Sequence, residues 1–234
     1  MEKIVSLFPE LFFQIERGRI TVKPMKGTAP RGRTLDEDIA FAETLEKDAK
    51  NRAENVMIVD LMRNDLGRIC RIGSVETPTL FEVKRYPSLW QMTSTVEGEL
   101  VEGCSVESLV RALFPPGSVT GAPKIRAMEH IVHLEASARG AYTGAIGYFA
   151  PDRAYFNVAI RTATLRGQSG TMGVGGGITL RLNGSGGVGR VSVEGIISDA
   201  KPAGIQDSGN DVLGRRVSLF RRSPREDEQI GDLF

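Results

Sequence analysis

A lysine between a proline and a glycine is the residue of this 234-residue chain whose setting points most directly to covalent chemistry. Lys26 lies in the segment Pro24-Met25-Lys26-Gly27-Thr28, directly after a predicted strand. Pro and Gly fix the backbone on both sides, so the side chain can project into a pocket where desolvation frees its amine for nucleophilic attack. The alternative for this pentapeptide alone is a solvated loop lysine.

Two charged residues lie on segments that are otherwise apolar. Glu54 shares a predicted helix face with apolar side chains, and a buried carboxylate there needs a proton, a partner or a metal such as Mg²⁺. The alternative is a surface glutamate paired with Lys50, four residues earlier. Arg161 lies in the predicted strand 158–163, where its natural partner is a carboxylate of the protein or of a substrate.

Two segments of small residues can offer backbone N–H groups to an anion. Ser118–Lys124 is a turn that enters a predicted helix, although it lacks the G-x-x-x-x-G-K-[ST] pattern of a P-loop. Gly173–Gly177 carries three consecutive glycines, which lets backbone amides approach a ligand carboxylate closely. The alternative for the second segment is a bulged strand end.

The elements that must position these side chains form a mixed α and β pattern. Strands are predicted over residues 11–14, 19–22, 80–85, 89–96, 142–149, 154–165 and 172–178. Helices are predicted from a cap at Asp36 towards Leu66 with one break, from a cap at Ser105 to a point before Pro115, and from Ala122-Pro123 to Leu134. The strands 142–149 and 154–165 are expected to form one hairpin that turns at Pro151-Asp152.

Composition narrows the class of protein. Apolar residues make up 41% and charged residues 25% of the chain, and 30 Lys+Arg against 29 Asp+Glu give a net charge of +1. That balance excludes the usual electrostatic signature of a nucleic-acid partner or an anionic membrane. No apolar run approaches the ~20 residues that span a bilayer, and two cysteines make no disulfide scaffold. These features predict a cytoplasmic globular protein, an enzyme or an enzyme subunit.

Taken together and in order, the motifs resemble one family. The matching segments are PMKGT (24–28), NRAENVMIVDLMRNDLGRI (51–69), LFEVKRYPSLWQMTSTVEG (80–98), ALFPPGSVTGAPKIRAM (112–128), YTGAIGY (142–148), 157–162 and 175–178. This run is similar to the C-terminal catalytic region of the chorismate-utilising enzymes. Within that family it resembles the aminodeoxychorismate synthase component I branch, because Lys26 fills a position where anthranilate and isochorismate synthases usually have Ala.

The resemblance implies a fold, a reaction and a site. The fold is α+β, a sandwich of antiparallel sheets with helices packed outside. Lys26 would attack chorismate and displace its 4-hydroxyl with Glu10 as general acid, and ammonia from a partner glutamine amidotransferase subunit would then give 4-amino-4-deoxychorismate for 4-aminobenzoate and folate. Glu54 matches a ligand of Mg²⁺. The residues that match chorismate contacts are Thr120, Gly121, Tyr148, Arg161, Gln91 and the glycines Gly175, Gly176 and Gly177.

The departures from the family bear on activity. Family members are about twice as long, so residues 1–178 are expected to form a partial, incomplete catalytic domain. The acidic helix that carries further Mg²⁺ ligands is replaced after Gly177, and 179–234 is expected to be a divergent, disordered tail. The alternatives to an aminating subunit are an enzyme like anthranilate synthase component I and a non-catalytic fragment of the family.

Overall fold

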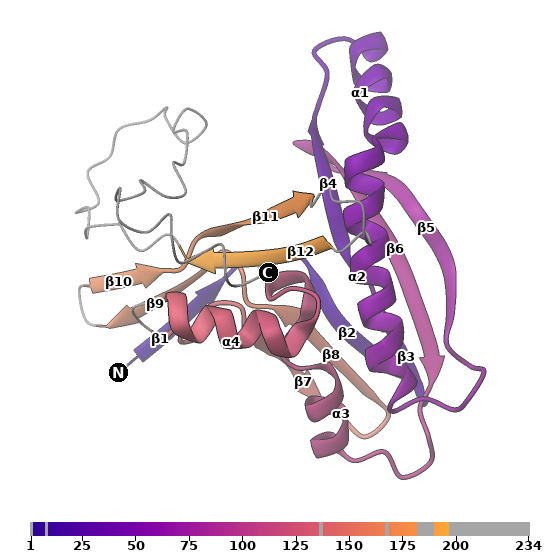
Figure 1. Ribbon diagram of the computed structural model, residues 1–234, viewed down its shortest axis with the longest axis vertical. Coiled ribbons are helices and arrows are strands. Elements are labelled where there is room, and N and C mark those ends of the chain that lie inside the picture. Colours follow the sequence, from indigo (N-terminus) through magenta and orange to yellow (C-terminus); the bar gives the residue numbers. More distant parts are fainter. Residues whose placement is uncertain (1, 8, 136–137, 167–168, 182–189, 197–234) are drawn as a thin grey trace. The chain divides into compact units, whose positions relative to one another are not determined.

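One antiparallel sheet dominates the protein in a computed structural model that describes residues 2–7, 9–135, 138–166, 169–181 and 190–196 (Figure 1). Among these residues, seven strands form this sheet in the order β4-β6-β3-β2-β8-β7, with β5 also paired to β6. The strands are β2 (Leu11–Glu16), β3 (Arg19–Val22), β4 (Met25–Pro30), β5 (Glu76–Arg85), β6 (Leu89–Glu99), β7 (Ala145–Phe149) and β8 (Arg153–Val158).

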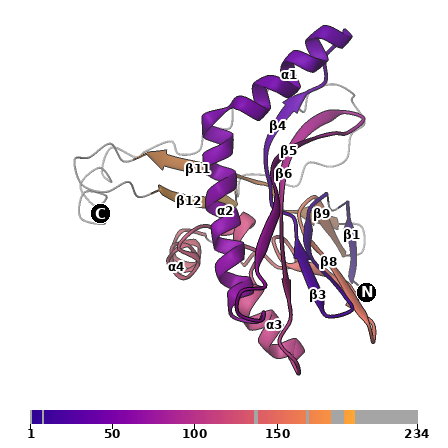
Figure 2. The ribbon, with the colours of Figure 1, turned by 90° about the vertical axis from the view of Figure 1, so that its right-hand side faces the viewer.

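The longest strand, β6, joins the parts of this sheet. Its first half pairs with β4 and its second half with β3, while β5 pairs along much of its length. The five residues from Met92 to Val96 are all buried, which is the pattern of a strand covered on both faces. Figure 2 shows α2 (Ala49–Gly67) lying along one face of this sheet, where it packs on β6 and β4.

The remaining helices precede or follow this strand. They are α1 (Leu35–Lys47), α3 (Val106–Leu113), the 3-10 turn η1 (Gly117–Val119) and α4 (Lys124–Leu134). Asp48 joins α1 to α2: its backbone N–H caps the end of α1, and its side chain accepts a 2.6 Å hydrogen bond from the N–H of Asn51 in α2. Among the described helices, none has both the length and the apolar character needed to cross a bilayer.

Two smaller sheets complete the described fold. The strand β9 (Thr162–Arg166) pairs with β1 (Glu2–Ser6) on one edge and with β10 (Ser169–Met172) on the other. The strands β11 (Gly175–Arg181) and β12 (Arg190–Ile196) pair with each other. The chain divides into the units 1–196 and 197–234, and the second unit lies outside the described residues. The predicted disordered tail, 179–234, falls mostly there and stays a prediction.

Most of the predicted elements are confirmed, with shifted ends. The hairpin of β2 and β3, the pair β5–β6 and the Ser105 cap of α3 are all present. The cap of the first helix is Thr34, whose hydroxyl accepts from the N–H of Glu37, and Asp36 lies in the first turn instead. The reason is that the helix begins at Leu35, so Thr34 precedes the first helical residue and has the extended backbone of a cap.

The predicted strand 154–165 is two strands in different sheets, separated by a break at 159–161. β8 ends at Val158, and the chain turns through Ile160 and Arg161 before β9 begins in another sheet. Arg161 has a φ of 50°, a left-handed conformation that is rare in a regular strand. Arg161 therefore lies in the connection between two sheets. The predicted strand 172–178 is likewise split between β10 and β11.

Candidate active site

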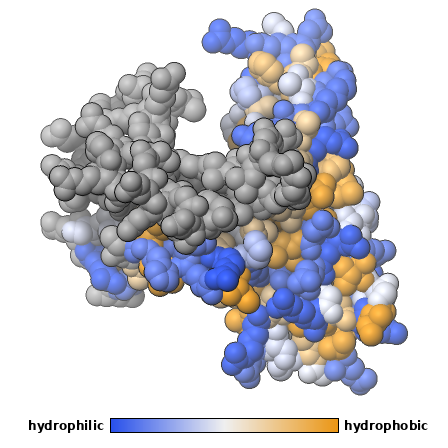
Figure 3. All heavy atoms as spheres, in the orientation of Figure 1, coloured by the Kyte–Doolittle hydropathy of each residue, from blue (hydrophilic) through white to orange (hydrophobic). Residues whose placement is uncertain are grey.

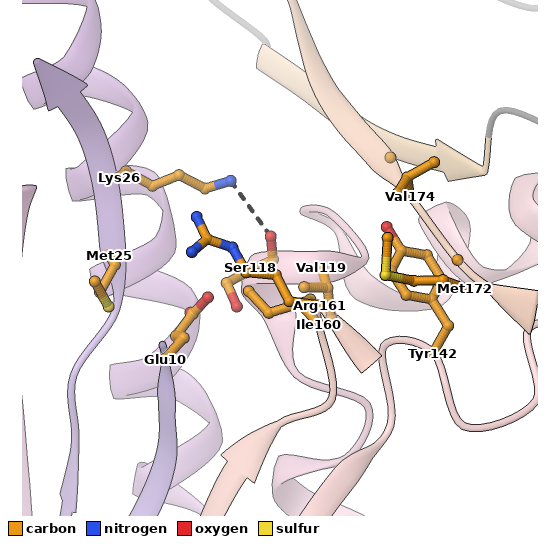
Figure 4. Close-up of a pocket in the computed structure, with 12 residues that line it drawn as sticks. Glu10, Met25, Lys26, Ser118, Val119, Tyr142, Ile160, Arg161, Met172 and Val174 are labelled. Carbon is orange, nitrogen blue, oxygen red and sulfur yellow. Dashed lines mark hydrogen bonds between the residues drawn. The ribbon is translucent and has the colours of Figure 1, made fainter. Parts of the chain in front are cut away.

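A cavity of about 300 Å³ lies where β4, η1 and the β8–β9 connection approach one another. Figure 4 shows the side chains that enter it from these separate elements. The residues that line it are Glu10, Met25, Lys26, Ser118, Val119, Tyr142, Ile160, Arg161, Met172, Gly173, Val174 and Gly175. Three of them, Glu10, Lys26 and Arg161, carry charge and were predicted as site residues from the sequence.

Lys26 enters the cavity from β4. Its side chain is half-buried, and its Nζ donates a hydrogen bond of 3.3 Å to the carbonyl oxygen of Ser118 in η1. The sequence predicted a corner after a strand, whereas Lys26 lies within β4, where the pairing with β6 shifts register between Met25 and Thr28. A β-bulge of this kind changes the direction in which a side chain points. Here the Lys26 side chain, which lies at the bulge, points into the cavity.

Glu10 and Arg161 lie beside this lysine. Glu10 is 7% exposed and immediately precedes β2, and its backbone carbonyl accepts from the N–H of Val158 at 3.0 Å. Figure 4 shows the guanidinium of Arg161 pointing toward the space between Lys26 and Glu10. An amine, a guanidinium and a carboxyl group thus converge on one volume, an arrangement suited to an anionic substrate and to proton transfer.

The far wall of the cavity is aromatic and glycine-rich. Tyr142 and Gly173 are in close contact, because a Cβ at position 173 would lie 2.3 Å from the Tyr142 ring. Only glycine permits this approach. Sequence reasoning missed Tyr142, although it is the first residue of the quoted YTGAIGY segment. Gly175 also lines the cavity, whereas Gly176 and Gly177 follow it in β11 and are described by their pairing with β12 alone.

A partly buried arginine holds the turn that faces Lys26. Arg139 donates to the carbonyl of Val119 at 3.1 Å, to the hydroxyl of Thr143 at 3.2 Å and to both carboxylate oxygens of Glu135. The Arg139 and Glu135 side chains are only 12% and 10% exposed. A paired guanidinium with several acceptors is a rigid support, so the position of η1 is fixed from behind the cavity.

Four residues that the resemblance predicted as chorismate contacts lie outside the cavity lining of the described structure. Thr120 is buried and donates its hydroxyl to the carbonyl of Pro116 at 3.0 Å, and Gly121 follows it. Tyr148 lies on β7 and is 53% exposed. Gln91 lies on β6, and its amide is bonded to Gly27 and Thr28. Their roles in substrate binding stay predictions.

The predicted metal ligand, Glu54, has a lysine as its neighbour. Glu54 lies on α2 with its side chain 19% exposed, and its Oε1 is 3.9 Å from Nζ of Lys50, the alternative partner that the sequence indicated. Among the described residues, no group of three His, Cys, Asp or Glu side chains is placed to hold a metal ion. Mg²⁺ requires octahedral oxygen coordination, so the described residues do not by themselves build a site that fits it.

The thiols have no place in this site. Cys70 is buried in the core, and desolvation together with the nearby Cys104 raises its pKa to about 11. Burial also raises the pKa of Cys104. A thiol nucleophile acts as the thiolate, so both groups are unsuited to that role.

Comparison with known proteins decides the family. The sequence model of the chorismate binding enzymes matches residues 1–181. This chain belongs to the chorismate binding enzyme family. Its fold agrees, since the solved structure of anthranilate synthase component I from Streptococcus pneumoniae superposes with a TM-score of 0.64 at 36% identity, covering 73% of this chain and 38% of that one.

Relatives of this chorismate binding enzyme carry two kinds of name. It is 49% identical over 177 residues to the aminodeoxychorismate synthase of Streptomyces griseus, covering 75% of this chain and 24% of that protein. It is 44% identical over 183 residues to anthranilate synthase component 1 of Mycolicibacterium smegmatis, covering 77% of this chain and 35% of that protein. The chain thus spans between a quarter and about a third of the length of these relatives.

Proposed function

We propose that this chain is the chorismate-aminating region of an aminodeoxychorismate synthase, a transferase that acts as the component I subunit. The observation that carries the proposal is the convergence of Lys26, Glu10 and Arg161 on one cavity. The relatives named aminodeoxychorismate synthase support it. Chorismate is a small dicarboxylate with a ring hydroxyl, so a guanidinium for a carboxylate, a carboxyl group for the hydroxyl and an amine for the ring suit its chemistry.

In the proposed reaction, Lys26 is the nucleophile. Its unprotonated amine forms a C–N bond to the chorismate ring, and the 4-hydroxyl leaves as water after it takes a proton from Glu10. Arg161 binds a substrate carboxylate through its paired N–H donors. Ammonia then forms the new C–N bond as the bond to Lys26 breaks, which gives 4-amino-4-deoxychorismate and returns the lysine.

Two further components belong to the proposal. The ammonia would come from glutamine through a partner amidotransferase subunit. Mg²⁺ would be bound with Glu54 as one carboxylate ligand, but the described residues do not complete its coordination. No step of the reaction above therefore passes through the metal, and the isolated chain is expected to turn over chorismate weakly or not at all.

The test follows the covalent intermediate, which needs no turnover. Purified chain is incubated with chorismate and Mg²⁺ without ammonia, quenched, digested and mapped by mass spectrometry. We expect a mass increase equal to chorismate minus one water on the peptide that contains Lys26, and none in Lys26→Gln. Adduct on another lysine, or no adduct in wild type under saturating chorismate, would contradict the proposed nucleophile.

A second candidate is anthranilate synthesis, which the 44% identity to proteins named anthranilate synthase component 1 favours. That reaction releases pyruvate and does not need an amine at position 26. If anthranilate and pyruvate appear with chorismate and ammonia, and Lys26→Ala forms as much or more of them, the second candidate replaces the first.

A further inference from the structure

The backbone that carries Lys26 contains one residue more than the strand beside it. Met25 pairs with Thr93 and Thr28 pairs with Gln91, so Lys26 and Gly27 lie opposite the single residue Met92. Such a bulge leaves one residue outside the ladder of hydrogen bonds. The polar groups of the extra residue then need other partners.

The bulge has little conformational freedom on the helix side. Gly27 has a φ of +95°, and a Cβ there would lie 3.1 Å from the Asn51 side chain and 3.2 Å from that of Leu45. Glycine is therefore required for both the left-handed backbone and the close approach of α2. The helices α1 and α2 thus limit how far this segment can shift in that direction.

A side-chain amide closes the bulge on the sheet side. Nε2 of Gln91 donates to the carbonyl oxygen of Gly27 at 2.8 Å, and the Thr28 hydroxyl donates to Oε1 of the same amide at 3.0 Å. Only one orientation of the amide satisfies both bonds, since a carbonyl oxygen accepts and never donates. Gln91 therefore bonds to both residues that follow Lys26 in the chain.

We infer that Gln91 is a positioning residue for Lys26, which it holds through the Gly27 carbonyl with Thr28 as its support. This inference rests on the proposed role of Lys26 as nucleophile. It differs from a direct contact of Gln91 with the substrate ring, because Gln91 is outside the cavity lining of the described residues. The function of the amide is to keep the Lys26 amine at the carbonyl of Ser118 and facing Glu10 and Arg161 (Figure 4).

The inference predicts the reactivity of Lys26 in the absence of any substrate. The whole chain is acylated with the N-hydroxysuccinimide ester of acetic acid at fixed pH, and the rate constant of each lysine is measured by peptide mass spectrometry. Gln91→Met cannot donate to Gly27, so the Lys26 amine is held less firmly at the carbonyl of Ser118. The acylation rate constant of Lys26 is therefore expected to rise about fivefold, the factor that corresponds to the net free energy of one hydrogen bond. Lys47 on α1, whose side chain is 72% exposed, is the internal control and keeps its rate.

Conservative variants separate positioning from general loosening. Gln91→Glu keeps the acceptor for Thr28 but loses the donor, so its Lys26 rate rises as in Gln91→Met. Thr28→Val raises the Lys26 rate by a smaller factor, and Thr28→Ser, which keeps the hydroxyl, leaves it unchanged. The double variant Gln91→Met with Thr28→Val has the same rate as Gln91→Met alone, because Thr28 acts on Lys26 only through the Gln91 amide.

Three results would overturn the inference. They are an unchanged Lys26 rate in folded Gln91→Met, a parallel rise at Lys47, and full additivity in the double variant. If the Gln91 variants do not melt cooperatively, the two Thr28 variants test the inference instead. A raised Lys26 rate in Thr28→Val but not in Thr28→Ser supports it, and equal rates in the two variants overturn it. If no chorismate adduct forms but Lys26 acylation rises in Gln91→Met as expected, only the proposed function is rejected. If the adduct forms on Lys26 but its acylation rate is unchanged in Gln91→Met, only the positioning role is rejected.

Discussion

Asp38 shows how much one buried carboxylate can organise. It is 6% exposed, and it accepts from Nε of Arg31 at 2.7 Å, from the indole N–H of Trp90 at 2.9 Å and from the backbone N–H of Gly32 at 2.9 Å. The guanidinium of Arg31 also bonds the carbonyl of Tyr86. This one side chain ties α1 to the loop before it and to the turn between β5 and β6.

The pH dependence of stability follows from the same residue. The Arg31 hydrogen bonds hold the pKa of Asp38 well below its usual range, although burial opposes this effect. The folded protein therefore binds fewer protons than the unfolded chain near pH 4. This contribution is complete above about pH 5, begins to fall as the pH drops through the unfolded pKa of about 4, and is lost as the pH falls on through the lower pKa of the folded state.

We predict that Asp38→Asn lowers the melting temperature at pH 7 and flattens its decline between pH 6 and pH 3. The measurement is thermal unfolding by circular dichroism across that range. Asp36→Asn, a change of the same kind in the first turn of the same helix, is the matched control. An equal slope in wild type and Asp38→Asn would contradict this account.

Among the elements, α4 is tied to α2 by a buried ion pair. Nζ of Lys124, the first residue of α4, lies 2.5 Å from Oδ2 of Asp65 and also donates to the carbonyl of Leu113 at 3.1 Å. The two side chains are 14% and 3% exposed. Burial raises the pKa of Asp65, and the Lys124 ammonium counteracts part of that rise.

Removing one member of this pair leaves the other buried and uncompensated. We predict that Asp65→Ala lowers the free energy of unfolding by about 3 kcal/mol, while the double variant Asp65→Leu with Lys124→Met costs less than Asp65→Ala. Urea denaturation with a shared m-value measures both. A double variant that is as unstable as Asp65→Ala, or less stable, would contradict the role of the pair in linking the helices.

The local elements were predictable from sequence because their signals are local. The turn at Arg17 and Gly18, both with positive φ, separates β2 from β3. The Ser105 hydroxyl caps α3 by accepting from the N–H of Ser108. The break at Arg161 was not predictable in this way, since β9 leaves the main sheet to pair with β1. That partner is at the other end of the described chain, and no local pattern contains it.

The site shows the same division. Lys26 was predicted from its segment and Glu10 from the family resemblance alone, and both lie with Arg161 around one cavity. Tyr142 was missed because its place depends on Gly173, thirty-one positions later, which approaches the ring directly. Contacts of this kind depend on tertiary packing and leave no periodic signal in the sequence.

At the scale of the whole molecule, apolar side chains are exposed on α4. Ile125, Val132 and Leu134 are 71%, 77% and 68% exposed. On the face that Figure 3 presents, hydrophobic side chains lie among hydrophilic ones. Exposed apolar side chains on one helix favour association with other molecules.

We predict that Ile125→Lys, Val132→Glu and Leu134→Gln together reduce self-association of the purified chain. The free energy of unfolding should change by no more than about 1 kcal/mol, because exposed positions contribute little to stability. Light scattering against protein concentration gives the readout, and Ala127→Ser, at a buried position of the same helix, should weaken folding without improving solubility. If the triple variant associates as much as the wild type, the exposed apolar side chains of α4 are not responsible for self-association.

The pairing of β1 with β9 has a consequence for biosynthesis. Glu2 lies opposite Arg166 and Ser6 opposite Thr162, so more than 150 residues are translated after β1 before its partner strand β9 exists. The β2–β3 hairpin can close early, whereas β1 has no partner strand during that interval. An unpaired strand edge on a nascent chain is prone to aggregation, which is a situation in which ribosome-associated chaperones are needed.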